Sequence, residues 1–442
     1  MTKCKQLSFE FSSCESRNVT ANFGGGEISS DGGIVLLGEV DKKLNLLNRA
    51  AEAFPDERQK SKVRHTQKSL LKQRVFALAQ GWEDLNDHDS LRHDPLLQTV
   101  AGSTKVLASS PTLCRMEARA NRNTAMELHR LLLRTFIESH GDDPPTELIL
   151  DFDATDDPIH GKQEGHFFHG YYDHYCFLPL YVFCGSQPLL AWLRPANIDG
   201  ARGAWLALKW LVEELRAEWP EVKIIWRADS GFCRWRMLAW SEKNDVDYIV
   251  GLAKNKRLGA MSEHLMEGAE RESNNTGKKV RRFGWLHYGA GTWDHKRLII
   301  CKAEHSRRGS NPRYVITSLC GDAQQIYDDV YCARGDMENR IKEQQLGLFA
   351  DRTSCHRWWP NQFRLLLSTL AYVLIDTLRR TALSGTDLAN AQATRIRLEI
   401  LKIGAVIIRN TRSIRIHLSS AWPRRNIFAK AHRILCPKLD SG

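Results

Sequence analysis

Two acidic residues each close an apolar run of strand length, and this pattern constrains the fold more than any other feature of the chain. Asp153 ends the run 148–153, and Asp229 ends the run 222–229. Between them, apolar residues recur three or four positions apart over 205–219, which predicts an amphipathic helix. Strands and helices in this order favour an α/β fold. We expect the two carboxylates to reach the same edge of its sheet.

The order of elements after residue 141 narrows the fold class. Alternating or continuous apolar runs predict strands before and after the helix, at 148–153, 175–184, 188–194, 222–228 and 248–253. Three strands, a helix and a fourth strand follow the order of an RNase H-like mixed sheet, in which the first and fourth strands lie side by side. The sequence therefore predicts that Asp153 and Asp229 meet across neighbouring strands.

A third acid, Glu338, lies in a charged stretch with helical periodicity at 331–348. The 109 positions between Asp229 and Glu338 are too many for a simple connection. Strands are predicted within this interval at 281–286, 296–303 and 314–319. We expect a β-rich insertion domain that interrupts the catalytic core.

The charge balance favours a polyanionic partner. The chain has 63 Lys and Arg against 52 Asp and Glu, for a formal net charge of +11. Basic residues crowd the regions 58–74 and 395–438, as expected for contacts with nucleic acid phosphates. The 11 cysteines contain no Cys-x-x-Cys pair, which argues against a zinc ribbon or a disulfide framework. With no secretory signal and no uninterrupted apolar span, a cytoplasmic location without a membrane is expected.

These signals predict five segments. The clearest boundary is the run Gly141–Pro145, which cannot continue the helix predicted at 123–139. The segments are a mainly helical N-terminal DNA-binding domain at 1–140, the first part of the core at 141–255, the insertion domain at 256–323, the second part of the core at 324–385, and a basic appendix at 386–442.

Three convergent carboxylates suit phosphodiester chemistry. Two divalent cations roughly 3.5 to 4 Å apart can activate an attacking oxygen and stabilise a leaving oxygen. Mg²⁺ prefers oxygen ligands, so we expect Mg²⁺, with Mn²⁺ as a substitute, held by Asp153, Asp229 and Glu338. Asp151 is an alternative first ligand, because side chains two apart on a strand share a face. Asp153 is preferred because it lies nearer the end of the strand.

One face of the helix around Glu338 is suited to holding phosphate. Tyr331, Arg334, Glu338, Lys342 and Gln345 follow one another at spacings of three or four. Two cations on this face can bind phosphates beside a metal-binding acid. A further basic cluster follows the strand that ends at residue 253. The predicted DNA-binding residues are Tyr331, Arg334, Lys342, Lys254, Lys256 and Arg257.

Several motifs together resemble the DDE transposases of bacterial insertion sequences. They are Ser110–Glu117, Leu150–Asp157 with His160-Gly161, Ala228–Phe232, Gly335–Glu343 and Asn361–Leu365. The chain resembles the branch with Tyr-x2-Arg-x3-Glu-x6-Lys around the glutamate, of the insertion sequence thirteen-eighty type. This resemblance implies recognition of terminal inverted repeats in double-stranded DNA, metal-dependent cleavage at the element ends, joining to target DNA, and a homodimeric active complex. The distal lysine of the motif is replaced by Gln345.

Other interpretations remain open at this point. A related nuclease would cut DNA without joining it, and an inactive relative would only bind DNA. His160, His166, His169 and His174 lie near Asp156 and Asp157, a combination that a transition metal could use. Trp285 and Trp293 of the predicted insertion domain could stack on a base.

Overall fold

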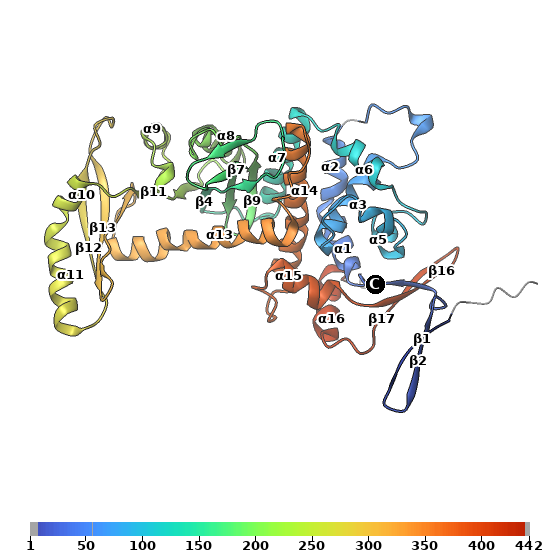
Figure 1. Ribbon diagram of the computed structural model, residues 1–442. Helices are drawn as coiled ribbons and strands as arrows, with labels where there is room; N and C mark the ends of the chain where they lie inside the picture. Colours follow the sequence, from blue (N-terminus) through green and yellow to red (C-terminus); the bar gives the residue numbers. More distant parts are fainter. Residues whose placement is uncertain (1–7, 55, 438–442) are drawn as a thin grey trace, which may run out of the picture. The chain divides into compact units, whose positions relative to one another are not determined.

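The computed structural model describes residues 8–54 and 56–437 and divides into two compact units (Figure 1). One unit combines Met1–Arg119 with Leu370–Gly442, and the other is Ala120–Thr369. This division differs from the five predicted segments, because it ends at residue 119 and joins the two ends of the chain. The five finer boundaries remain predictions.

The sheet at the centre of the second unit has the predicted strand neighbours. β4 (Glu147–Ala154) pairs in parallel with β10 (Lys223–Ala228), and β10 pairs in parallel with β11 (Asp247–Leu252). On the other side, β8 (Leu180–Cys184) and β9 (Gln187–Trp192) continue the sheet antiparallel to β4. The first and fourth strands are therefore side by side, as predicted. This is a mixed α/β fold with a mixed sheet.

The predicted strand at 175–184 is divided in two. β7 (His174–Phe177) belongs to a separate three-stranded sheet, and only β8 joins the central sheet. Pro179 lies at the break, and proline cannot donate a hydrogen bond to a central strand. A continuous strand across 175–184 was therefore a wrong prediction.

The three strands predicted between Asp229 and Glu338 are confirmed. They are β12 (Val280–Tyr288), β13 (Arg297–Ser306) and β15 (Arg313–Thr317). Since β15 pairs antiparallel with β11, these strands and the short β14 (Gly309–Ser310) beside β13 extend the central sheet to nine strands. They do not form a sheet of their own.

Helices precede β12 where the sequence predicted none. α9 (Trp235–Lys243), α10 (Lys256–Met261) and α11 (Glu263–Thr276) occupy this region, and α11 lies beside β12 and β13 (Figure 1). The polar run 272–277 forms mostly the last turn of α11. The fully buried residues of α11 are Gly268, Ala269 and Ser273, and Leu265 and Met266 are partly buried against the same core. Large apolar residues occur only near the start of the helix, so its sequence lacks the sustained apolar spacing that predicts a helix.

Helices cover both faces of the sheet. Ile224 and Trp226 of β10 pack into a core that includes α7 (Arg122–Glu138) and α8 (Ala204–Glu218). Ile225 faces the opposite side and packs with the helical segment that begins at α12 (Ala323–Gln325). This segment continues through π-helical and 3₁₀ turns into α13 (Gly335–Lys342). The alternation along β10 thus produces a three-layered arrangement.

The first unit joins segments from both ends of the chain. β3 (Glu27–Ser29) pairs with β16 (Ala405–Arg409), which pairs with β17 (Ile414–Leu418). The other elements of this unit are β1 (Ser8–Cys14), β2 (Arg17–Asn22), α1 (Ile34–Leu44), α2 (Leu46–Glu52), α3 (Gln67–Gln80), α4 (His88–Leu91), α5 (Pro95–Val100), α6 (Ser110–Glu117), α15 (Ala393–Ile396) and α16 (Arg425–Leu435). The ladder between β3 and β16 joins the basic C-terminal segment to the N-terminal part of the chain.

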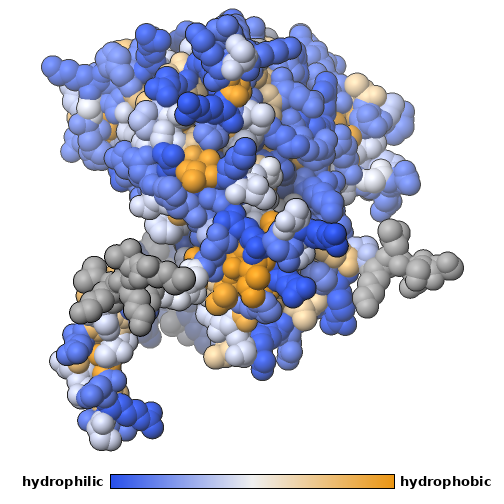
Figure 2. All heavy atoms as spheres, turned by 90° about the vertical axis from the view of Figure 1, so that its right-hand side faces the viewer, coloured by the Kyte–Doolittle hydropathy of each residue, from blue (hydrophilic) through white to orange (hydrophobic). Residues whose placement is uncertain are grey.

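α14 (Trp358–Thr377) has residues in both units. Its first turns belong to the second unit, where the Gln362 amide accepts a hydrogen bond from Leu193 N at 2.7 Å and donates one to Ala191 O at 2.9 Å. The surface drawn in Figure 2 is largely hydrophilic with small apolar patches. Among the described residues, no helix has both the length and the apolar character needed to cross a membrane.

Candidate active site

The three predicted acids line one cavity. Asp153 lies near the end of β4, Asp229 directly follows β10, and Glu338 lies in α13. In the register of the two strands Ala228 is opposite Phe152, so the next residue on each strand is one of the two aspartates. The cavity has a volume of about 610 Å³ and is also lined by Arg334, Lys342 and Gln345. The fold therefore brings the acids to one place from three separate elements.

Asp229 is held by the turn that follows it. Its Oδ1 accepts a hydrogen bond from Gly231 N at 2.9 Å, which caps the short helical turn Ser230–Phe232. Gly251 on β11 permits this packing, because a Cβ there would lie 2.7 Å from Ser230 N and 2.8 Å from the Tyr331 hydroxyl. A side chain at residue 251 would displace the backbone next to Asp229.

The carboxyl group of Asp153 is largely buried and lies near two other acids. Its side chain is 17% exposed, and its Oδ1 accepts a hydrogen bond from Ala154 N at 2.9 Å. Burial raises the pKa of Asp153 to about 7, the Arg334 guanidinium opposes that rise, and the charges of Asp229 and Glu338 add to it. A cation among these carboxylates would relieve the repulsion.

Arg334 is the nearest fixed positive charge. Its Nη2 lies 2.8 Å from Glu338 Oε1, and its Nη1 lies 3.8 Å from Asp153 Oδ2. Burial lowers the pKa of Arg334, but the charges of Asp153, Tyr331 and Glu338 outweigh it and raise that pKa overall. Arg334 therefore bridges two of the acids.

Asp151, the alternative first ligand, has another partner. Both of its carboxylate oxygens bind the Arg227 guanidinium, with Nη2 to Oδ2 at 2.9 Å, and its side chain is 2% exposed. Arg227 Nη1 also donates to Val330 O at 2.6 Å. Asp151 does not line the cavity. This geometry favours Asp153 over Asp151 as the ligand.

The predicted DNA-binding residues divide into two groups. Lys342 and Arg334 line the cavity, and Tyr331 packs at its edge near Gly251. Lys254, Lys256 and Arg257 do not line it. Arg257 lies over the Tyr288 ring and donates to Gly289 O at 3.2 Å. Gln345, which replaces the lysine of the motif, donates to Asp156 O at 2.8 Å.

The sequence interpretation missed an aromatic wall of this cavity. His169, Tyr171 and Tyr172 line it from the hairpin of β6 (Phe167–His169) and β7. Phe168 and Tyr171 are 51% and 85% exposed, respectively. The histidines of this segment were the available signal, but the sequence interpretation connected them only with a transition metal.

The alternative transition-metal site is not supported by the geometry. His174 Nε2 lies 2.9 Å from Asp156 Oδ2, but no three ligand atoms of this histidine-rich segment lie within 4.8 Å of one another among the described residues. Over the same described ranges, that criterion is met by Glu242, Asp294 and His295, which are exposed. Arg297 already binds both Glu242 and Asp294. The three cavity acids do not meet this criterion either.

Asp157 is a buried acid beside the cavity hairpin and yields a prediction about stability. It lies in β5 (Asp157–Pro158), where Oδ2 accepts a hydrogen bond from Thr353 Oγ1 at 2.8 Å and Oδ1 has no partner. Burial raises the pKa of Asp157 well above its usual value. The native state therefore holds this proton at a pH where the unfolded chain releases it, and stability falls as the pH rises. We expect Asp157→Asn to raise the melting temperature at pH 8 more than at pH 5.

The matched control is Asp142→Asn, because Asp142 is exposed and has no recorded side-chain partner. Thermal unfolding followed by circular dichroism at both pH values measures the effect. An equal change at pH 5 and pH 8 would contradict a raised pKa for Asp157.

Comparison with known families decides the identity of the chain. Residues 11–438 match the family model described as Transposase DDE domain group 1. The chain belongs to this family. Membership makes it a transposase, with the polynucleotidyl transferase chemistry and divalent metal use that are general in DDE transposases.

Two further comparisons add little. No curated protein matches this transposase. Among solved structures, it is similar to a piggyBac transposase in a synaptic complex with hairpin DNA, with 11% identity, a TM-score of 0.40, and coverage of 93% of this chain and 87% of that one. A likeness this distant carries no argument about the site.

Proposed function

We propose that this transposase excises and inserts a bacterial insertion sequence of the thirteen-eighty type. It binds the terminal inverted repeats, cuts at the element ends, and joins the freed 3′-hydroxyl to target DNA. The observation that carries the proposal is the convergence of Asp153, Asp229 and Glu338 on one cavity in a member of the DDE transposase family. The parallel pairing of β4 and β10 supports an RNase H-like core.

The donor set of the cavity fits divalent metal. Three carboxylates line the cavity together with two cationic residues, Arg334 and Lys342. The pKa of Asp153 is raised because its side chain is buried near other acids. Asp153, Asp229 and Glu338 would hold Mg²⁺, or Mn²⁺ as a substitute. When bound, such a metal pair activates the attacking oxygen and stabilises the leaving oxygen.

The cations of the chain position the DNA backbone. Arg334, fixed by Glu338, is aimed at the same space as the acids, and Lys342 lies two turns further along the helical segment. Both can hold phosphates that flank the reacting one. Lys254, Lys256 and Arg257 lie outside the cavity, where they contact more distant phosphates without reading sequence. Tyr331 supports the cavity edge through its packing against Gly251.

The remaining parts of the proposal follow from the needs of the reaction. Two element ends must be cut together, so the active complex is a homodimer on double-stranded DNA. The basic regions at 58–74 and 395–438 bind DNA outside the cavity. The protein works in the bacterial cytoplasm, where it associates with the nucleoid through DNA.

The test incubates wild-type protein with labelled element ends and an unlabelled target plasmid, and measures nicked and joined DNA over time. With Mg²⁺ we expect nicked ends first and joined products later, and with EDTA we expect neither product. Cut ends that never join would replace the proposal with a nuclease. Binding of the ends without any cutting would replace it with an inactive DNA-binding relative.

A further inference from the structure

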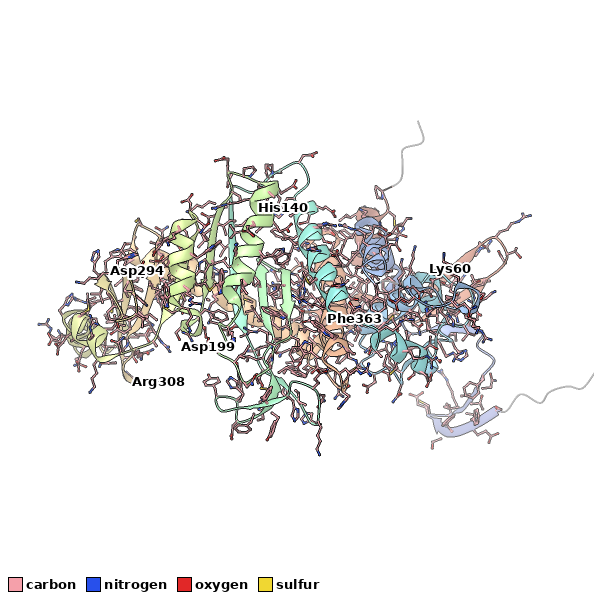
Figure 3. All side chains as sticks on the ribbon, turned by 90° about the horizontal axis from the view of Figure 1, so that it is seen from above. Lys60, His140, Asp199, Asp294, Arg308 and Phe363 are labelled. Carbon is pink, nitrogen blue, oxygen red and sulfur yellow. The ribbon has the colours of Figure 1, made fainter. Side chains whose placement is uncertain are left out.

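A second large groove adjoins the cavity of the three acids. Its volume is about 1160 Å³. Gly200 lines the acid cavity, whereas Asp199, labelled in Figure 3, and Ala201 line the groove. On the facing segment, Gly231 and Phe232 line the cavity, and Arg234 lines the groove. Arg234 forms an ion pair with Asp199 at this shared rim. A strand that leaves the cavity can therefore enter the groove.

The groove carries an excess of positive charge. Its lining contains four arginines, Arg194, Arg202, Arg234 and Arg236, against the single acid Asp199. Arg194 is 2% exposed and hydrogen-bonds only carbonyl oxygens through Nε and Nη1, while its Nη2 is buried without a partner. Within residues 8–54 and 56–437, no carboxylate makes a hydrogen bond or ion pair with this buried guanidinium. Such a charge beneath the groove favours an anionic ligand.

Two helices begin at the groove and add to its positive electrostatic potential. Trp205 and Leu206 lie in the first turn of α8, and Trp235 and Arg236 open α9. Neither helix has a side-chain cap or an acidic residue in its first turn. The partial positive charge of both N-termini is therefore left for a ligand to complement.

The same groove is lined by tryptophans. Trp192, Trp205 and Trp358 are half-buried, and Trp235 is 44% exposed with the Arg236 guanidinium 5.7 Å from its ring centroid. Duplex DNA presents its phosphates outward and keeps its bases stacked inside, so it would leave these rings unused. Unpaired nucleotides expose base faces that stack on aromatic rings while cations follow the backbone.

We propose that this groove binds an unpaired stretch of DNA strand next to the strand end held in the acid cavity. The inference rests on the proposed function, which supplies DNA to that cavity. In this arrangement Trp235 stacks on a base, and Arg236 and Arg202 contact phosphates. The duplex would be opened beside the cut site rather than remain fully paired.

The experiment measures binding of a fluorescein-labelled oligothymidylate of about ten nucleotides to the full chain by fluorescence anisotropy. Divalent metal is omitted so that the probe is not cut. We expect Trp235→Ala to weaken binding roughly tenfold and Trp235→Phe to restore most of the loss, because a base still has a ring to stack on. Binding of a fully paired duplex should change little in either variant.

Salt dependence separates the role of the arginine from that of the tryptophan. Each phosphate contact to a single strand contributes a slope of about 0.7 in log affinity against log salt. We expect Arg236→Ala to reduce the slope by about this amount and Trp235→Ala to leave it unchanged. The matched control is Arg271→Ala, which removes an exposed arginine of the same unit that does not line the groove.

Unchanged affinity and slope in both groove variants would overturn the inference, as would an equal loss of duplex and single-strand binding in Trp235→Ala. These outcomes are independent of the cutting and joining assay. If the wild-type protein joins DNA and the groove variants bind DNA as the wild type does, the proposed function stands and the proposed role of the groove is wrong. If the wild-type protein never cuts DNA but the variants show the expected binding pattern, the role of the groove stands and the proposed function is wrong.

Discussion

Asp229→Asn and Glu338→Gln should each reduce cleavage of element ends by roughly a thousandfold or more, because metal binding in such sites contributes several kcal/mol to transition-state stabilisation. Both substitutions keep the size of the side chain and remove one charged ligand from the cavity. Asp229 also caps the turn through Gly231, a hydrogen bond that an asparagine oxygen can still accept. The loss should therefore appear in the chemical step, measured as the rate of nicking with Mg²⁺.

The matched control for this loss is Glu221→Gln, since Glu221 is exposed and does not line the cavity. It removes one negative charge from the same unit and should cut at the wild-type rate. Binding of the element ends should remain in all three variants, and removal of a negative charge can strengthen it. Normal nicking and joining by Asp229→Asn or Glu338→Gln would show that the site is assigned to the wrong residues.

Asp151→Ala should lower the free energy of unfolding by about 3 to 5 kcal/mol, because it leaves a buried cation without its partner. Asp151 and Arg227 are 2% and 9% exposed and form a two-pronged ion pair across β4 and β10. The double variant Asp151→Leu with Arg227→Met should recover much of this loss, since it removes both charges. Chemical unfolding of the three proteins measures the effect.

Asp153→Asn provides the contrast that separates a ligand from a structural acid. Asp153 faces the cavity and two like charges, so its substitution should abolish cutting without the loss of stability expected for Asp151→Ala. A stable but inactive Asp151→Ala protein would reverse these roles and make Asp151 the ligand.

The apolar runs before Asp153 and Asp229 were sufficient to predict β4 and β10 and their adjacency. The position of each strand follows from a local apolar run, and the adjacency of the first and fourth strands follows from the strand order of an RNase H-like sheet. Both signals are present in the sequence. The end of β7, the break at Pro179 and the start of β8 were less accessible, because an apolar run continues across both strands. α11 escaped prediction because its apolar residues Leu265, Met266 and Ala269 all lie in its first half, so no apolar spacing continues along the helix.

The candidate site could likewise be predicted only in part from the sequence. The helical spacing of Arg334, Glu338 and Lys342 predicted one functional face, and all three residues line the cavity. The hairpin residues Tyr171 and Tyr172 could not be assigned to that cavity, because their position depends on pairing between β6 and β7. The groove of tryptophans and arginines joins segments around residues 194, 205, 235 and 358, which no local pattern connects.

The sequence by itself determined which residues are candidates for the chemistry: three acids, a basic helical face and an excess of cations, since residue type and local periodicity are properties of the chain alone. Only the tertiary structure gives a reason to favour Asp153 over Asp151. Period two places both on the same face of β4, and the choice depends on Arg227 of the neighbouring strand, which binds Asp151 and leaves Asp153 facing the cavity. The strands after α11 likewise extend the central sheet because β15 finds the free edge of β11, a contact between distant segments that no single stretch of sequence encodes.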